Sequence, residues 1–239
     1  MKATLLFFVL NAIHFVLFSQ EKTTIYCFPG QGANRHLFDS LRLDTNYTLK
    51  IIEYGTPERG MDIKSFAKSL AVQIDTTQKF VLLGVSLGGM ICVELNELLH
   101  PEKTILISSA KNRNELPFRY KFQKVIPFYK LFGGKILIVG AKCLQPIVEP
   151  DRNKNKATFK AMLGSKSPIY MKRSIALIIN WERTTNTKQI YHIHGAKDHT
   201  LPIKHIVKPY AIVSKGSHMM TLTSAKEISK IVNTILLEK

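Results

Sequence analysis

Residues 84–88 read Gly-Val-Ser-Leu-Gly, and this stretch decides the fold because it directly follows the apolar run Phe-Val-Leu-Leu at 80–83. A Gly-x-Ser-x-Gly sequence between a strand and a helix forms a sharp turn that exposes its serine. The turn holds the serine in a strained backbone conformation, and the glycines lack the Cβ atoms that would collide with the flanking strand and helix. The pattern therefore predicts that Ser86 is a nucleophile.

An acid and a histidine follow two strand-like runs farther along the chain. Asp198 comes after the run at 189–194, and His218 comes after the run at 210–213. The chain order is therefore serine, acid, histidine, with each residue placed after a predicted strand. Functional residues of open parallel sheets gather at the carboxyl ends of the strands, so we expect these three side chains to meet.

This arrangement resembles the α/β-hydrolase superfamily, in which the catalytic residues occur in the same chain order. The resemblance covers about residues 23–110 and 187–239. It implies that Ser86 is the nucleophile and that His218 is the general base. It implies further that Asp198 orients His218 and stabilises its charged form.

The resemblance also implies an oxyanion hole formed by two backbone N–H groups. One belongs to Leu87, which follows the nucleophile, and the other belongs to Gln31 in the stretch Phe-Pro-Gly-Gln-Gly at 28–32. Many relatives carry His-Gly where this chain has Pro29 and Gly30, a difference that leaves the amide geometry plausible. Because the role belongs to the backbone, the side chain of Gln31 is not required for it.

Other residues stay open as alternatives for the acid and the base. A loop aspartate or histidine is often an ordinary turn or surface residue, and Glu115 follows the fourth predicted strand as a second candidate acid. Several histidines compete with His218 by proximity, namely His192, His194, His199 and His205. We expect His192 and His194 to be buried residues of a strand.

The same histidines raise the question of a metal site. His192 and His194, followed by Asp198 and His199, are similar to the His-x-His-x-Asp-His pattern of the metallo-β-lactamase family. Three residues separate the two halves here, where that pattern has one, so the ligands would be misplaced. We expect no metal and no cofactor.

Short apolar runs alternate with helical patterns over most of the chain. Strands are predicted at 23–28, 47–54, 80–83, 104–108, 189–194 and 210–213. Helices are predicted at 34–41, 63–74, 87–99 and 224–237. The alternation predicts an α/β fold with a mostly parallel, six-stranded sheet flanked by helices.

The two parts of this core, residues 20–110 and 188–239, are separated by an insertion at 111–187. Apolar residues in the insertion have helical spacing, interrupted by proline and glycine. These helical patterns lie at 120–131, 156–163 and 170–181. We interpret the insertion as a helical cap over the active site, which is where members of the resembling superfamily carry insertions.

The chain is strongly basic, with a formal net charge of +17, and the excess is concentrated in the insertion. Residues 111–173 contain fifteen Lys and Arg but only three Asp and Glu. The excess is compatible with a solvated face, an acidic substrate, or an anionic membrane surface beside exposed aromatic residues. No nucleic-acid partner is expected, because the chain lacks an aromatic and basic binding motif.

Residues 1–19 resemble a secretory signal peptide, with a basic start and an apolar run to residue 18. This predicts export to the periplasm or the exterior, with an uncleaved membrane anchor as the alternative. The chain has three cysteines, so at least one thiol is free and no disulfide framework is expected. Cys27 and Cys92 are predicted to be small buried hydrophobes.

Together these features imply an exported serine hydrolase that cleaves a small-molecule carboxylic ester through an acyl-enzyme intermediate. A serine at the turn argues against dehalogenase or epoxide hydrolase chemistry, since those branches need an aspartate there. The alternatives on the same fold are a thioesterase, an acyltransferase with an acceptor other than water, and a non-catalytic protein that binds a membrane surface.

Overall fold

The structure is a computed structural model, and part of the chain lies outside its description. It describes residues 22–149, 151–155, 157–158 and 167–238. The predicted signal peptide at 1–19 and most of the helical pattern at 156–163 lie outside these residues. Within the described ranges, no helix has both the length and the hydropathy needed to cross a bilayer.

The centre of the fold is a six-stranded sheet in which every pair of neighbouring strands is parallel. Its strands are β1 Thr23–Phe28, β2 Tyr47–Ile51, β3 Phe80–Val85, β4 Lys103–Ile107, β5 Tyr191–Gly195 and β6 Ala211–Val213. Their order across the sheet is β2-β1-β3-β4-β5-β6. The six predicted strands and the α/β class are confirmed, although β2 ends three residues earlier than predicted.

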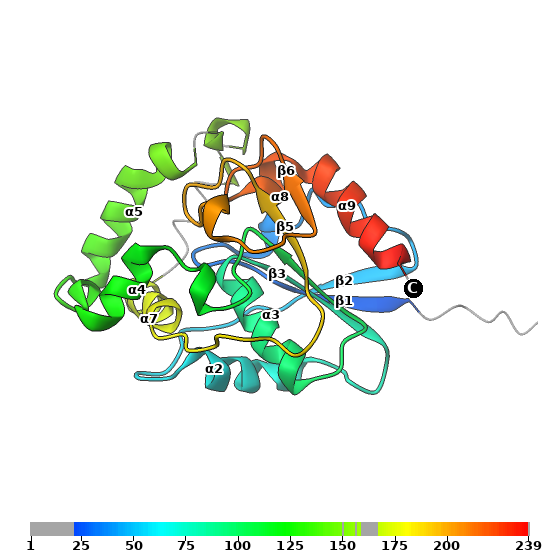
Figure 1. The fold of residues 1–239 in the computed structure, drawn as a ribbon, viewed down its shortest axis with the longest axis horizontal. Helices are drawn as coiled ribbons and strands as arrows, with labels where there is room; N and C mark the ends of the chain where they lie inside the picture. Colours follow the sequence, from blue (N-terminus) through cyan, green and yellow to red (C-terminus); the bar gives the residue numbers. More distant parts are fainter. Residues whose placement is uncertain (1–21, 150, 156, 159–166, 239) are drawn as a thin grey trace, which may run out of the picture.

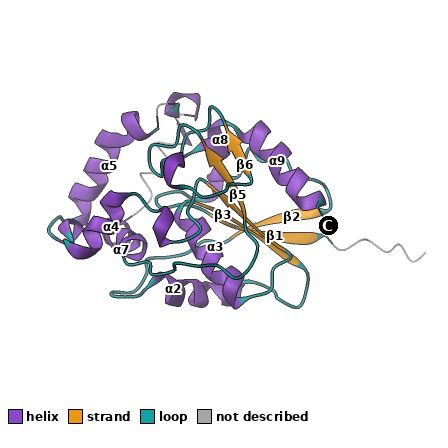
Figure 2. Ribbon diagram, viewed as in Figure 1, coloured by secondary structure: helices purple, strands orange, loops and turns teal. Residues whose placement is uncertain are grey.

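Helices cover both faces of this sheet, which explains why the inner strands β3 and β4 are almost entirely apolar and buried (Figures 1 and 2). The covering helices are α2 Ile63–Leu70, α3 Leu87–Leu98, α8 Met220–Thr223 and α9 Ala225–Leu237. Successive side chains of β1 alternate between the two faces. Tyr26 and Phe28 pack in the core shared with α2 and α3, whereas Ile25 and Cys27 pack in the core shared with α9.

Three further helices, α4 Phe118–Val125, α5 Gly134–Val148 and α7 Pro168–Ile179, lie between β4 and β5 in the chain. α4 and α5 both pack against α7, and the group lies at one end of the sheet (Figure 1). The sequence did not predict α5, because glycines 133 and 134 and Pro146 were interpreted as interruptions. Pro146 is tolerated near the end of α5, where its missing N–H affects only the last turn.

One predicted helix, at 34–41, is wrong. The chain forms only a short 3₁₀ turn, η1 Arg35–Leu37, in which the His36 N–H donates to the Asn34 side chain at 3.1 Å. The turn ends at Phe38, and the chain then leaves helical geometry while Phe38 and Leu41 remain buried in the core. Apolar residues at helical spacing thus pack on the sheet here without forming a helix.

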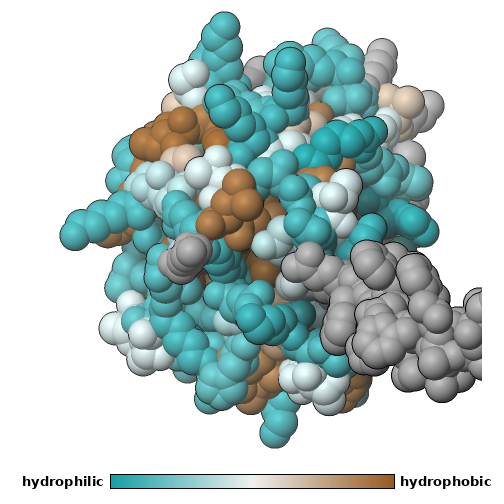
Figure 3. Space-filling view, turned by 90° about the vertical axis from the view of Figure 1, so that its right-hand side faces the viewer, coloured by the Kyte–Doolittle hydropathy of each residue, from teal (hydrophilic) through white to brown (hydrophobic). Residues whose placement is uncertain are grey.

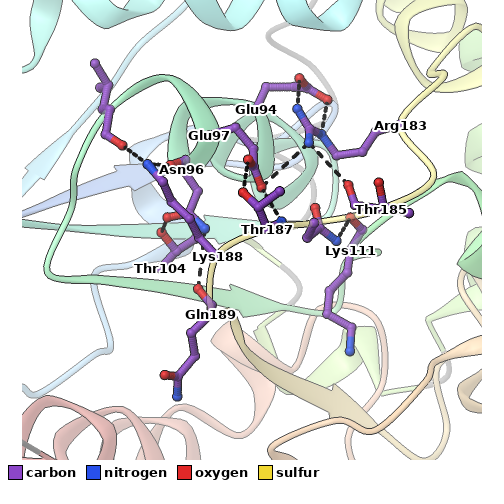
Figure 4. Close-up of polar contacts among 12 residues, drawn as sticks. Glu94, Asn96, Glu97, Thr104, Lys111, Arg183, Thr185, Thr187, Lys188 and Gln189 are labelled. Atoms are coloured by element: carbon purple, nitrogen blue, oxygen red, sulfur yellow. Dashed lines mark hydrogen bonds and ion pairs between the residues drawn. The ribbon is translucent and has the colours of Figure 1, made fainter.

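A buried ion pair fastens the chain that returns from the insertion to helix α3 (Figure 4). Arg183 donates to both carboxylate oxygens of Glu94 at 2.8 Å, and the Trp181 indole N–H donates to the same carboxylate at 2.7 Å. Beside it, the backbone N–H and hydroxyl of Thr187 donate to Glu97 at 3.0 and 2.6 Å. These contacts hold the segment before β5 against α3, the helix that follows Ser86.

Replacing Arg183→Met should lower the free energy of unfolding by about 3 kcal/mol, because it leaves the buried Glu94 carboxylate without its cation. The measurement is urea denaturation followed by circular dichroism. Lys124→Met is the matched control, since it removes an ion pair with the exposed Glu182 and should change stability by less than about 1 kcal/mol. Equal stability of the two variants would contradict a structural role for the Arg183 pair.

Candidate active site

Ser86 sits in a backbone conformation that few residues other than glycine adopt. Its φ is 53° and its ψ is −121°, and α3 begins at the next residue. Both neighbouring glycines are required by space: a Cβ on Gly88 would lie 2.1 Å from the carbonyl oxygen of Phe28. A Cβ on Gly84 would lie 2.5 Å from the carbonyl oxygen of Gly88. The sharp turn therefore depends on close backbone packing between β1, β3 and α3.

The structure brings Ser86, His218 and Asp198 together at the carboxyl ends of β3, β6 and β5. His218 Nε2 lies 2.9 Å from Ser86 Oγ, and His218 Nδ1 lies 2.8 Å from Asp198 Oδ2. An ionised carboxylate only accepts hydrogen bonds, so Nδ1 carries the proton and Nε2 presents its lone pair to the serine hydroxyl. This is the tautomer in which an imidazole can remove a proton from Ser86.

Asp198 is fixed by further hydrogen bonds. Its Oδ1 accepts from the backbone N–H groups of Thr200 at 2.8 Å and Leu201 at 2.7 Å. Burial raises the pKa of Asp198, but the charge and hydrogen bond of His218 and the Leu201 N–H outweigh it, so the net shift is downward. Asp198 therefore stays ionised beneath the imidazole.

Burial and nearby charges shift the pKa of His218 in opposite directions. Burial lowers it, while the carboxylates of Asp198 and Glu149 raise it, and the net shift is upward from the ordinary value of histidine. A raised pKa makes His218 a stronger base once it has lost its proton. It also means that more of the imidazole is protonated near neutral pH.

The two amides predicted for the oxyanion hole flank Ser86. Leu87 is the first residue of α3, so its N–H has no acceptor within the helix. Gln31 lies in the turn after β1, in which a Cβ on Gly30 would be 3.1 Å from Ser86 Cβ. The Tyr54 hydroxyl donates to the carbonyl oxygen of Pro29 and holds this turn in place.

The side chain of Gln31 has a contact that sequence reasoning missed. Its amide donates to Ser174 Oγ at 2.8 Å and to the Met171 carbonyl oxygen at 3.3 Å, both on α7. Gln31 therefore joins the turn beside Ser86 to the inserted helices. No sequence signal identified this pair, because 143 positions separate the two side chains.

The histidines of β5 form a second layer behind Asp198. His194 donates through Nε2 to the Leu201 carbonyl oxygen at 2.7 Å, and its Nδ1 lies 3.1 Å from His192 Nε2. Both rings are buried, and burial lowers both pKa values, that of His192 well below the ordinary value. As predicted, these are interior residues of a strand, and they are neutral.

The remaining alternatives lie elsewhere. His199 is exposed and His205 is half-buried, whereas His218 contacts Ser86. Glu115 is buried and accepts from the backbone N–H groups of Lys111 at 2.7 Å and Val207 at 3.0 Å, away from the imidazole of His218. Among the described residues, no group of three or more His, Cys, Asp or Glu side chains is placed to hold a metal ion.

Glu149, just beyond α5, is a second carboxyl group beside the histidine loop, and no sequence pattern indicated it. It is buried, and its Oε2 accepts from the backbone N–H of Met219 at 3.3 Å. Burial raises the pKa of Glu149 to about 7, against a lowering effect of nearby His218. An acid from the insertion thus titrates near neutral pH next to His218.

The sheet order, the Ser86 turn and the inserted helices together define a class: the chain has the α/β-hydrolase fold, as the sequence predicted. A hydrolase from Pseudomonas aeruginosa PA01 superposes with a TM-score of 0.68 at 16% identity, over 91% of both chains. The enol-lactonase from Burkholderia xenovorans LB400 gives a TM-score of 0.67 at 12% identity, over 91% of this chain and 92% of that one.

Similarity in sequence is more limited. The chain is 36% identical over 86 residues to the pimeloyl-[acyl-carrier protein] methyl ester esterase of Neisseria meningitidis serogroup C. The match covers 33% of this chain and 32% of that protein, so the chain spans about a third of the length of the curated relatives it matches. No protein-family model matches the chain.

Replacing Glu149→Gln should lower the pKa of His218, because it removes a carboxylate that favours the charged imidazole. The measurement is a pH titration of the histidine resonances by nuclear magnetic resonance. Glu182→Gln, at an exposed position, is the matched control and should leave that pKa unchanged. An unchanged His218 pKa in Glu149→Gln would show that the two groups are not coupled.

Proposed function

We propose that the protein is a serine hydrolase that cleaves a small-molecule carboxylic ester through an acyl-enzyme intermediate. The observation that carries the proposal is the unbroken hydrogen-bond path from Asp198 through His218 to Ser86, at 2.8 and 2.9 Å. The donors and acceptors along this path match the requirements of nucleophilic catalysis, because the Asp198 carboxylate accepts from the imidazole of His218 and the free nitrogen of that imidazole faces the Ser86 hydroxyl.

In the proposed mechanism, His218 Nε2 takes the hydroxyl proton while Ser86 Oγ forms a bond to the acyl carbonyl carbon. The backbone N–H groups of Leu87 and Gln31 stabilise the oxyanion of the tetrahedral intermediate. Protonated His218 then gives its proton to the leaving alcohol, and the ester C–O bond breaks. Water, deprotonated by His218, attacks the acyl-enzyme and releases the acid and free Ser86.

We further propose that the insertion at 111–187 covers the site as a cap. Contacts from three of its parts support this: Ser174 meets Gln31, Glu149 meets Met219, and the Asn155 side chain donates to the Leu222 carbonyl oxygen at 3.2 Å. The first contact involves Gln31 itself, and the second involves the residue that follows His218. A cap in this position shapes the space available to the acyl group.

The sequence comparison favours an ester as the substrate, because the relative in Neisseria meningitidis is named for a methyl ester bond. The two structural neighbours above are named as a hydrolase and an enol-lactonase, and another structure with the same fold is named as a thioesterase. The low identity and partial coverage leave the acyl group and the alcohol to be found by assay. A panel of nitrophenyl esters that differ in acyl length, run beside the matching thioesters, identifies the bond that is cleaved.

Ser86→Ala should remove the reaction with a fluorophosphonate while the protein remains folded. The parent should gain the mass of one phosphonyl group, because an activated serine displaces fluoride at phosphorus. Intact-mass spectrometry measures the adduct, and Ser214→Ala, at an exposed serine, is the control that should label fully. An adduct that persists on Ser86→Ala, or its absence on the folded parent, would contradict the assignment.

Asp198→Asn should reduce ester turnover by about 10³- to 10⁴-fold, since the amide favours the wrong imidazole tautomer. Stopped-assay or spectrophotometric rates on the best nitrophenyl ester measure the loss. Asp39→Asn removes an exposed carboxylate that pairs with His36 and should retain full turnover. Full turnover in Asp198→Asn would place the orienting acid elsewhere.

A further inference from the structure

Large hydrophobic side chains are exposed in one segment of the insertion far more densely than in the rest of the described chain. Nine of the sixteen exposed large hydrophobic residues lie within residues 118–139. Three of them are almost as open as in an unfolded chain: Phe118 is 72% exposed, Leu131 77% and Val125 79%. We name the exposed hydrophobic side chains of 118–139 the apolar surface. Clusters of this kind mark interaction sites in soluble proteins.

Five of the nine residues of the apolar surface form two helical stripes, and the other four lie in the segment between α4 and α5. Phe118, Phe122 and Val125 are spaced by four and three residues and so lie on one face of α4. The rings of Phe118 and Phe122 are in contact, with centroids 5.4 Å apart. Ile136 and Val139 have the same spacing on α5 and are also exposed. Both helices pack on α7, which leaves these stripes to solvent.

Positive charge accompanies the apolar surface. Residues 116–148 contain six Lys and Arg and not one Asp or Glu. Among them, Lys130, Lys135 and Lys142 are exposed. Long basic side chains beside apolar residues place their methylene groups on the apolar layer and their charges at its edge. This combination is complementary to the head groups and outer acyl region of an anionic bilayer.

The other end of the molecule differs. Figure 3 shows the face at the right of Figure 1, away from the inserted helices, and that face is mostly hydrophilic with separate small apolar areas. Among the described residues, the inserted helices combine exposed helical stripes with an excess of positive charge, and the face in Figure 3 has no comparable apolar area. Self-association through this end would bring like charges together, and interface cores between proteins are depleted in lysine.

We propose that the apolar surface docks the protein onto an anionic phospholipid bilayer, with Phe118, Val125, Leu131, Ile136 and Val139 entering the head-group boundary. Lys130, Lys135 and Lys142 then contact the lipid phosphates. α4 and α5 pack on α7, and α7 contacts Gln31 in the turn beside Ser86, so docking through the outer faces of α4 and α5 places two helix layers between the membrane and that turn. The proposal does not depend on the hydrolase activity, and its test contains no substrate.

Vesicle flotation of the full-length chain measures docking. Vesicles of phosphatidylcholine alone are compared with vesicles containing equal parts phosphatidylcholine and phosphatidylglycerol, at low and high salt. We expect binding to the anionic vesicles only, and weaker binding at high salt because the attraction is electrostatic. Equal binding to both vesicle types, unaffected by salt, would overturn the proposal.

Two pairs of substitutions assign the binding to this surface. Val125→Ser with Leu131→Ser should weaken binding at least tenfold, as should Lys135→Gln with Lys142→Gln. The matched controls, Val72→Ser with Val207→Ser and Lys226→Gln with Lys230→Gln, change residues exposed on other elements. The N-terminal segment is present in every variant, so differences arise from the substituted surface. Equal loss in the controls, or none in the tests, would overturn the proposal.

Cys143 supplies a direct probe, because it is exposed on α5 while Cys27 and Cys92 are buried. Cys143 follows Val139 by one helical turn. A polarity-sensitive fluorophore on Cys143 should shift its emission to the blue on anionic vesicles. The control places the same label at Val72→Cys in a Cys143→Ser background and should not shift. A Cys143 shift that needs high protein concentration but no vesicles would assign the surface to a second copy of the chain instead.

Discussion

The left-handed backbone of Ser86 is the constraint on which the rest of the structure depends. Because the φ of Ser86 is 53°, the chain turns sharply enough for β3 to end and α3 to begin on either side of this single residue. The space for that turn comes from Gly88, which touches the Phe28 carbonyl group so closely that no side chain fits. The turn therefore fixes the distance between β1, β3 and α3, and with it the place of Gln31 beside Ser86. A strain of about 1–3 kcal/mol is maintained by this surrounding packing.

The insertion is attached to the core both by apolar packing, in which Tyr170, Leu177 and Trp181 share a hydrophobic cluster with the strands, and by polar contacts near the site. Gln31 binds α7, Glu149 binds the backbone beside His218, and Arg183 binds α3 behind Ser86. Each polar contact joins a part of the insertion, or the chain leaving it, to an element that carries a residue of the proposed mechanism. A change in how the inserted helices sit, for example on a bilayer, thus has a physical route to His218 and to the turn at Gln31.

The sequence predicted the parts of this molecule that local patterns encode. Short runs rich in apolar and β-forming residues predicted all six strands, and the Gly-x-Ser-x-Gly stretch placed Ser86 before a helix, because both patterns are formed by residues that are neighbours in the chain. Asp198 and His218 were predicted as the acid and the base because each follows a predicted strand. Three other features depend on contacts between residues that are distant in the chain, and local patterns did not predict them. The segment 34–41 packs on the core without becoming a helix, α5 forms despite Pro146, and Glu94 meets Arg183 across 89 positions.

The two carboxyl groups near His218, those of Asp198 and Glu149, have pKa values shifted in opposite directions because their surroundings differ. Asp198 accepts two backbone N–H groups and the imidazole N–H, and these outweigh its burial, so it keeps its charge. Burial dominates for Glu149 and raises its pKa to about 7. A permanently charged Glu149 would raise the pKa of His218 further and leave more of the resting imidazole protonated, a form that cannot act as a base. With a pKa of about 7, Glu149 is about half protonated at neutral pH, which weakens that effect, while its hydrogen bond from Met219 still fastens the insertion to the histidine loop.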